Sequence, residues 1–188
     1  MRVAVMLYSG FQLLEVTGVM DVFHEANRLY GQTFYEQHLV GPSPGPVVCS
    51  NGTAVGTTRS LGTLREPFDI VVVPGSPVVV GPGEHRELVD WLGDAGRRAQ
   101  RLASVSNGAF LLARAGVADH HWLTTHWRHA ERLASEYPLV HVTSRLGCLK
   151  DGNLYSAGGV NDGIHLALAF VGEDLGEQLA ARIGSTMA

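Results

Sequence analysis

The stretch FDIVVVPG, at residues 68–75, limits the possible folds more than any other part of the sequence. Its central residues, Ile70–Val73, are all branched and apolar, without the apolar–polar alternation of a half-exposed strand. Such a run is typical of a parallel strand that is buried on both faces of its sheet. The following Pro74-Gly75 pair favours a turn. A chain built around this strand needs helices on both sides of the sheet.

Strand-like and helix-like segments alternate along the rest of the chain. Strands are predicted over residues 3–7, 34–41 and 102–106, and strand pairs over residues 45–58 (around Asn51-Gly52) and 139–159 (around Asp151-Gly152). Helices are predicted over residues 17–31, 83–100, 108–116, 126–138 and 160–183. Thr17 is the expected N-cap of the first helix and Gly31 its C-cap, and the last helix is expected to break near Gly172. The pattern predicts an α/β protein, a three-layer α/β/α sandwich with a mostly parallel, flavodoxin-like sheet.

Length and composition predict one domain over residues 1–188 and exclude several functions. The net charge is -4, which offers no basic surface for nucleic acid or an anionic membrane. Cys49 and Cys148 are too few for a disulfide framework, and the first apolar run is too short for a signal peptide or a membrane span. We therefore expect a cytoplasmic protein. No phosphate-binding glycine loop is present, so no nucleotide cofactor is expected.

Four segments are expected at the carboxyl edge of the sheet, where open α/β sheets bind ligands. They are residues 9–15, 74–77 and 156–162 and the turn that begins at Ser106. Ser106 lies between a strand-like and a helix-like run, in a position typical of a nucleophile. A serine without a partnered base is a poor nucleophile, and Ser104 replaces the first glycine of the hydrolase pattern G-x-S-x-G. Alternatively, Ser106 only caps the helix.

Two further residues at this edge have both a functional and a structural interpretation. Glu15 lies in an apolar stretch, where it is either a general acid/base that partners Ser106 or a solvated loop residue. Gly75 and Ser76 follow the buried strand, and their backbone N–H groups are suited to an oxyanion or a carboxylate. A tight turn after a strand is also a common structural feature.

Several histidines gather in the segment DHHWLTTHWRH, at residues 119–129. The pattern has no zinc-binding spacing, and no metal site is expected. We expect His126 to line the pocket and His120, His121 and His129 to be solvated. Asn161 and Asp162 are expected to cap the last helix.

The stretches VAVMLYSGFQLLEVTGVMDVF, DIVVVPGS, ASVSNGAFLLARAGV, TTHW and DGNLYSAGGVNDGIHLALAFV together resemble one family. They are similar to the DJ-1/PfpI superfamily, which has the class I glutamine-amidotransferase-like fold. The resemblance is strongest to the branch that holds isonitrile hydratases and the N-terminal domains of AraC-type transcriptional regulators. It covers nearly the whole chain, so residues 1–188 are interpreted as one DJ-1/PfpI-like domain.

The resemblance implies roles for particular residues. Ser106 stands where the family has its nucleophilic cysteine, Asn107 where it usually has threonine, and Glu15 where an acidic residue hydrogen-bonds the cysteine. The expected catalytic set is therefore Ser106, Glu15, Asn107 and Gly75. The expected ligand-binding set is Gly75, Ser76, Ser106, Asn107, His126 and Trp127.

Three functions are compatible with serine at position 106. The chain is either a domain that senses a small ligand in an AraC-type regulator, a hydratase-like enzyme with its cysteine replaced, or an enzyme that uses the serine for hydrolysis or hydration. In the first case DNA is contacted only through a domain outside these residues. A homodimer without cofactor and a small, largely apolar or amide-like ligand are expected.

Overall fold

The computed structural model describes residues 1–79, 81, 83–94 and 96–187. Ala95, inside the predicted helix 83–100, and Ala188, the end of the predicted domain, lie outside the described residues. The described part contains a seven-stranded sheet of order β10-β11-β7-β6-β1-β2-β5. The strands are β1 (Arg2–Met6), β2 (Glu36–Gly41), β5 (Arg59–Ser60), β6 (Ile70–Val73), β7 (Arg101–Val105), β10 (Cys148–Asp151) and β11 (Leu154–Ala157). Within this sheet of the described residues, β10 and β11 are the only antiparallel pair, so the predicted α/β fold with a mostly parallel sheet is confirmed.

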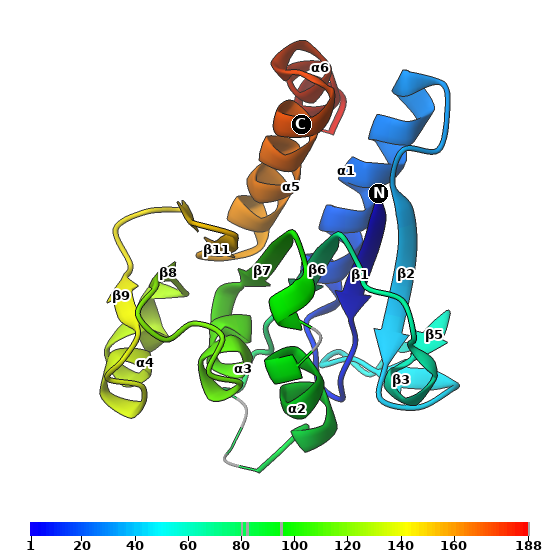
Figure 1. The fold of residues 1–188 in the computed structure, drawn as a ribbon. Coiled ribbons are helices and arrows are strands. Elements are labelled where there is room, and N and C mark those ends of the chain that lie inside the picture. Colours follow the sequence, from blue (N-terminus) through cyan, green and yellow to red (C-terminus); the bar gives the residue numbers. More distant parts are fainter. Residues whose placement is uncertain (80, 82, 95, 188) are drawn as a thin grey trace.

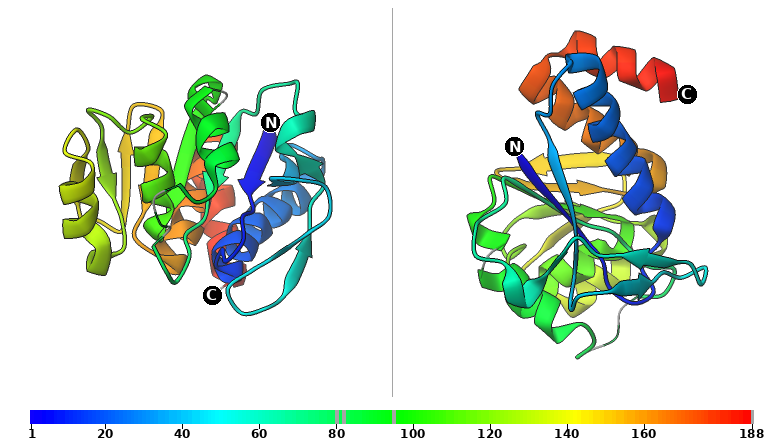
Figure 2. Two further views of the ribbon diagram at one scale, coloured as in Figure 1. Left: turned by 90° about the horizontal axis from the view of Figure 1, so that it is seen from below. Right: turned by 90° about the vertical axis from the view of Figure 1, so that its right-hand side faces the viewer.

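Helices cover both faces of this sheet (Figure 1). On one face lie α1 (Leu13–Tyr30) and α5 (Val160–Leu175), and α6 (Glu177–Met187) packs against both of them (Figure 2). On the other face lie α2 (Arg86–Asp94) and α3 (Ala109–Arg114). The helix α4 (Ala130–Glu136) lies at the β10 side with a small parallel sheet of β8 (Trp122–Thr124) and β9 (His141–Thr143).

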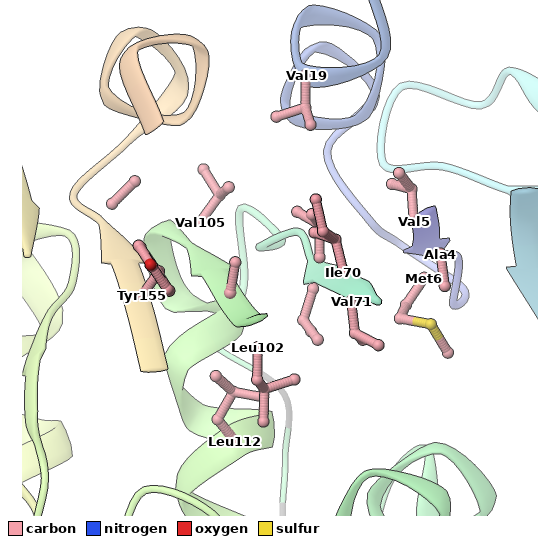
Figure 3. Packing of buried hydrophobic residues seen from close by; sticks show 14 of the residues in the cluster. Ala4, Val5, Met6, Val19, Ile70, Val71, Leu102, Val105, Leu112 and Tyr155 are labelled. Carbon is pink, nitrogen blue, oxygen red and sulfur yellow. The ribbon is translucent and has the colours of Figure 1, made fainter. Parts of the chain in front are cut away.

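The core lies on both faces of the central strands. All four residues of β6 are buried, as the unbroken apolar run predicts. Figure 3 shows Val19 of α1 on one side of the sheet and Leu112 of α3 on the other, with Ile70 and Val71 between them. This double-sided packing fixes β6 and β7, so the turns that follow them have a defined position.

The helix ends differ from the predictions at two places. The helix α1 begins at Leu13, so Thr17 is not its N-cap; its hydroxyl instead donates to the Leu13 carbonyl inside the helix. Gly31 is the C-cap as predicted, with φ +83°. The last helix breaks at Gly176, where φ is +97°, and not at Gly172, which stays helical. Neither Asn161 nor Asp162 caps α5, because the N-cap is Gly159 and no side chain bonds there.

Both predicted hairpin turns are present, but one strand pair was missed. The turn at Gly52 joins β3 (Pro46–Val48) to β4 (Ala54–Gly56), and the turn at Gly152 joins β10 to β11. The segment His141–Thr143 does not join that hairpin, because it pairs with β8, a strand that the sequence did not indicate. The predicted helix 83–100 is α2 followed by a short 3-10 turn at Gly96–Arg98. No helix of the described residues is long and apolar enough to span a bilayer.

Candidate functional site

Three of the four predicted edge segments meet where β1, β6 and β7 end. Glu15 lies in the first turn of α1, Gly75 follows β6, and Ser106 follows β7. A side chain at position 75 would start within about 3.0 Å of both Glu15 and Ser106, so only glycine leaves room for this meeting. The fourth segment, residues 156–162, contributes no described residue to the cavity beside this point.

Ser106 has a backbone conformation that is rare for a residue with a side chain. Its φ is +53°, and it opens a 3-10 turn, Ser106–Gly108, that leads into α3. Such strain persists only where surrounding structure holds it and is a feature of functional turns. No side chain caps this turn or α3, so the interpretation of Ser106 as a helix cap is wrong. Its hydroxyl hydrogen-bonds Glu15, while Thr125 Oγ1 donates to its carbonyl at 2.8 Å.

Glu15 is buried and is not the solvated loop residue of the second interpretation. Only 3% of it is exposed, and its Oε2 accepts a hydrogen bond from the Gly75 N–H at 2.6 Å. Burial raises the pKa of Glu15 to about 7, although the hydrogen bonds from Gly75 and Ser106 lower it. A carboxyl with this pKa is near half-protonated at neutral pH, so it is able to take up or release a proton there.

The Gly75-Ser76 turn has no free N–H group for an oxyanion. The Gly75 N–H is bonded to Glu15, and the Ser76 N–H donates to Asn107 Oδ1 at 2.7 Å. Asn107 Nδ2 in turn donates to the Ser76 carbonyl at 2.6 Å. The side-chain amide has both an acceptor oxygen and donor hydrogens, so it pairs with the backbone N–H and the backbone C=O of Ser76. The Gly75 N–H thus binds a carboxylate of the chain itself, the Ser76 N–H binds an amide oxygen, and neither group is exposed for an oxyanion as expected.

A cavity of about 240 Å³ opens beside Ser106. It is lined by Gln12, Ser76, Pro77, Ser106, Asn107, His126, Arg128 and His129. Of the predicted ligand-binding residues, Ser76, Ser106, Asn107 and His126 belong to this lining. Gly75 lies just behind it, and Trp127 is not in it, because 65% of that side chain is exposed and the ring stacks against His126.

Sequence reasoning missed Gln12, Pro77, Arg128 and His129 in this lining. The three-residue spacing of His126 and His129 was the available signal for His129, whose ring centroid lies 5.8 Å from that of His126. The side chains are mostly polar, so of the two expected kinds of ligand the amide-like one fits the cavity better than the largely apolar one. A second hollow of about 510 Å³ shares only Ser76 and Pro77 with the first.

Basic groups lie on one side of the cavity. Arg128 follows His126, and its guanidinium lies 5.0 Å from the centre of the Trp127 ring. The pKa of His129 is lowered, first by burial and then by electrostatic interaction with His126, Arg132 and Arg128. Among the described residues, no group of three or more His, Cys, Asp or Glu side chains is placed to hold a metal ion.

Comparison with known proteins finds one matching family and several related proteins. Residues 1–173 match the DJ-1/PfpI family. The HTH-type transcriptional regulator CdhR of Pseudomonas aeruginosa is 30% identical over 95% of this chain and 52% of the regulator. An isonitrile hydratase of Pseudomonas putida is 28% identical over 96% of this chain and 75% of the hydratase.

Comparison with solved structures also finds a transcriptional regulator. The crystal structure of an AraC family transcriptional regulator from Pseudomonas putida has a TM-score of 0.87 and 26% identity, and the match covers 100% of this chain and 99% of that one. The chain spans about half the length of the curated regulators that it matches. From the family match over residues 1–173, we conclude that the chain belongs to the DJ-1/PfpI family.

Proposed function

We propose that this chain is the ligand-sensing domain of an AraC-type transcriptional regulator. The observation that carries the proposal is the hydrogen bonding of the Gly75-Ser76 turn, which lies beside Ser106. Both N–H groups of Gly75 and Ser76 are bonded to the chain's own side chains, Glu15 and Asn107. The site therefore has a cavity for a small molecule and lacks two of the donors that an acyl or imidate intermediate needs.

The chemistry of Ser106 supports a binding function as well. A serine hydroxyl is far less acidic than a cysteine thiol, and it stays almost wholly protonated at neutral pH even beside a carboxyl such as Glu15, whose pKa of about 7 suits a general base. Each missing oxyanion donor costs about 10²–10³ in turnover rate. Ser106 without free donors at Gly75 and Ser76 is thus a poor catalyst and a suitable hydrogen-bonding group for a ligand.

Similarity to regulators supports the proposed cellular role. CdhR of Pseudomonas aeruginosa and the structurally similar Pseudomonas putida protein are both named as transcriptional regulators. The net charge of -4 leaves DNA contact to a domain outside residues 1–188. The expected homodimer and the cytoplasmic location stay predictions.

The native gene provides the first test. We expect the reading frame to continue past codon 188 into a basic helix-turn-helix region. The full-length protein is then screened by thermal shift for ligands, and its affinity for its own promoter is measured with and without each hit. A stop codon directly after codon 188, or a promoter affinity that no bound ligand changes, would overturn the sensor proposal.

A hydratase-like enzyme with a replaced cysteine is the second candidate. The observation in its favour is that the strained turn at Ser106 and the protonatable Glu15 are both present, as an isonitrile-hydrating thiolate would require. Ser106→Cys tests it, with the parent chain as control for the native Cys49 and Cys148 and for turnover by Ser106 itself. We expect Ser106→Cys to alkylate with iodoacetamide but not to hydrate small isonitriles. Turnover by this variant would favour the enzyme, and turnover by the parent chain would favour a serine mechanism.

A further inference from the structure

We propose that the cavity beside Ser106 takes a small monocarboxylate, whose negative group is held by Arg128 with the imidazoles of His126 and His129. The inference rests on the proposed sensing function for its biological purpose and adds the chemical class of the ligand. Three observations carry it: an uncompensated cation, an inner end with neutral polar groups, and the size of the cavity.

The cation at the cavity has no acidic partner among the described residues. Arg128 lines the cavity, and no lining side chain is a carboxylate. Its guanidinium contacts the Trp127 ring, and its backbone N–H donates a hydrogen bond to His126 Nδ1 at 3.3 Å. By contrast Arg132, one turn further along, pairs with Glu136 at 2.6 Å. Arg128 is exposed, as are Arg65 and Arg145, which also have no carboxylate partner among the described residues; its place in the cavity lining is what would bring a bound anion to it.

The number of charges favours a carboxylate over a dianion such as phosphate. Arg128 is the one permanent cation in the described lining. The imidazole of His129 has a lowered pKa, so it is mostly neutral at pH 7 and acts as a hydrogen-bonding group. One guanidinium compensates one negative charge, and its planar fork matches the two oxygens of a carboxylate.

The inner end of the cavity suits the rest of a short molecule. Ser106 and Asn107 are buried there, and the Asn107 amide uses its oxygen and one of its two N–H hydrogens on Ser76. The Ser106 hydroxyl and the Gln12 side chain remain as polar groups in the lining. A volume of about 240 Å³ lies below the range of about 300–1,000 Å³ typical of sites for drug-sized ligands. The cavity thus selects for a compact acid with a polar or short apolar remainder.

The test compares matched molecules on the 188-residue chain. Propionate and pyruvate are compared with propionamide, methyl pyruvate and inorganic phosphate, by thermal shift and isothermal titration calorimetry. We expect propionate or pyruvate to bind saturably and to raise the melting temperature, with the amide, the ester and phosphate giving no saturable binding. Propionamide keeps the shape of propionate and removes its charge, so it isolates the contribution of the anion; methyl pyruvate removes the charge of pyruvate with the addition of one methyl group.

Variants identify the group that holds the anion. Arg128→Gln is expected to weaken binding of the carboxylate about tenfold or more, since hydrogen bonds to charged groups are the strong ones. Arg132→Gln is the matched control: it removes a nearby arginine outside the cavity lining and should leave the affinity within about twofold. Arg128→Lys keeps the charge without the fork, so its affinity should lie between those of the parent and Arg128→Gln.

Several results would overturn the inference. They are equal binding of propionamide and propionate, binding of phosphate alone, no binding by any member of the panel, and an Arg128→Gln affinity equal to that of the parent. None of these results bears on the reading frame after codon 188 or on promoter binding. A failure of the ligand class is therefore distinguishable from a failure of the proposed function.

Discussion

At the scale of single residues, Glu15 combines burial with a charge that the surrounding structure only partly compensates. Its carboxyl receives hydrogen bonds from the Gly75 N–H and from Ser106, yet burial outweighs them and raises its pKa to about 7. In the unfolded chain the same group has its ordinary pKa near 4.5. Between these values the folded state keeps a proton that the unfolded state releases, so stability falls as the pH rises from about 4.5 to 7.

We expect Glu15→Gln to remove this pH-dependent loss of folding stability. Glutamine has a similar shape, and its Oε1 is still able to accept the Gly75 hydrogen bond. At pH 8 we expect the variant to be more stable than the parent, by up to about 3 kcal/mol, because no charge is buried. Below pH 4.5 the two should agree, since Glu15 is then protonated in both states. Urea unfolding at several pH values measures this difference.

The exposed Glu131 provides the control for that experiment. Glu131→Gln changes the same charge at the surface of α4 and should show no gain that grows with pH. A Glu15→Gln variant that is equally or less stable than the parent at pH 8 would show that the carboxylate at position 15 is well solvated or paired.

Residue identity alone predicted part of this site. The positions of Ser106, Glu15 and Gly75 at one edge follow from strands that end together, so sequence reasoning places them correctly. The use of the Ser76 peptide group by Asn107 depends on a contact between residues that are 31 positions apart in the chain. No local pattern encodes such a contact, and the same is true of Arg128 at the cavity.

At the scale of elements, the turn between β7 and α3 is held by a close approach to the end of β6. A Cβ atom at position 108 would lie 2.4 Å from the Val73 carbonyl oxygen and 2.7 Å from that of Pro74. Both of those atoms belong to the backbone, which has no alternative rotamer to adopt. The absence of a side chain at Gly108 is what allows Ser106 and Gly75 to meet.

Gly108→Ala is therefore expected to be strongly destabilising. The φ of Gly108 is -54°, so the cost comes from the contact and not from the backbone conformation. We expect a loss of about 2–4 kcal/mol in the free energy of unfolding, measured in urea. Gly62→Ala is the control, because nothing lies within 4 Å of its added Cβ, and its effect should stay within about 0.5 kcal/mol. Equal effects at the two positions would contradict the close approach.

Elements with strong local patterns were predictable and short ones were not. The strands β6 and β7 and the turns at Gly52 and Gly152 follow from apolar runs and turn residues. The strand β8 has three residues, and it exists because β9 pairs with it. The start of α1 at Leu13 also has no local N-cap signal, since Gln12 makes no capping bond with its side chain.

At the scale of the whole molecule, a partly buried ion pair joins elements at the edge opposite the cavity. Arg101 at the start of β7 donates two hydrogen bonds of 2.7 Å to Asp174 at the end of α5. Tyr35, next to the start of β2, donates to the same carboxylate at 2.7 Å. The Arg101 and Asp174 side chains are only 14% and 11% exposed, so each depends on the other for compensation. The contact fixes α5 to the sheet without approaching Ser106.

Asp174→Ala is expected to weaken the fold without changing the cavity. It leaves the Arg101 guanidinium and the Tyr35 hydroxyl without their main partner; the loss of one half of a fully buried pair costs about 3–5 kcal/mol, and this pair is partly buried. Glu173, 3.3 Å from Arg101, compensates in part, so we expect the lower end of that range. Asp174→Asn keeps an acceptor and should lose less. Urea unfolding measures both variants.

The Arg101–Asp174 pair lies far from the cavity, so its effect on stability can be measured separately from any effect on ligand binding. Glu136→Ala breaks the exposed Arg132–Glu136 pair and should cost less than about 1 kcal/mol. Because Arg101 and Ser106 lie at opposite ends of β7, the folded fraction of Asp174→Ala should bind propionate with the affinity of the parent. A lower affinity in the fully folded variant would show that the two edges of the sheet are coupled, and that α5 transmits the state of the cavity to the opposite edge.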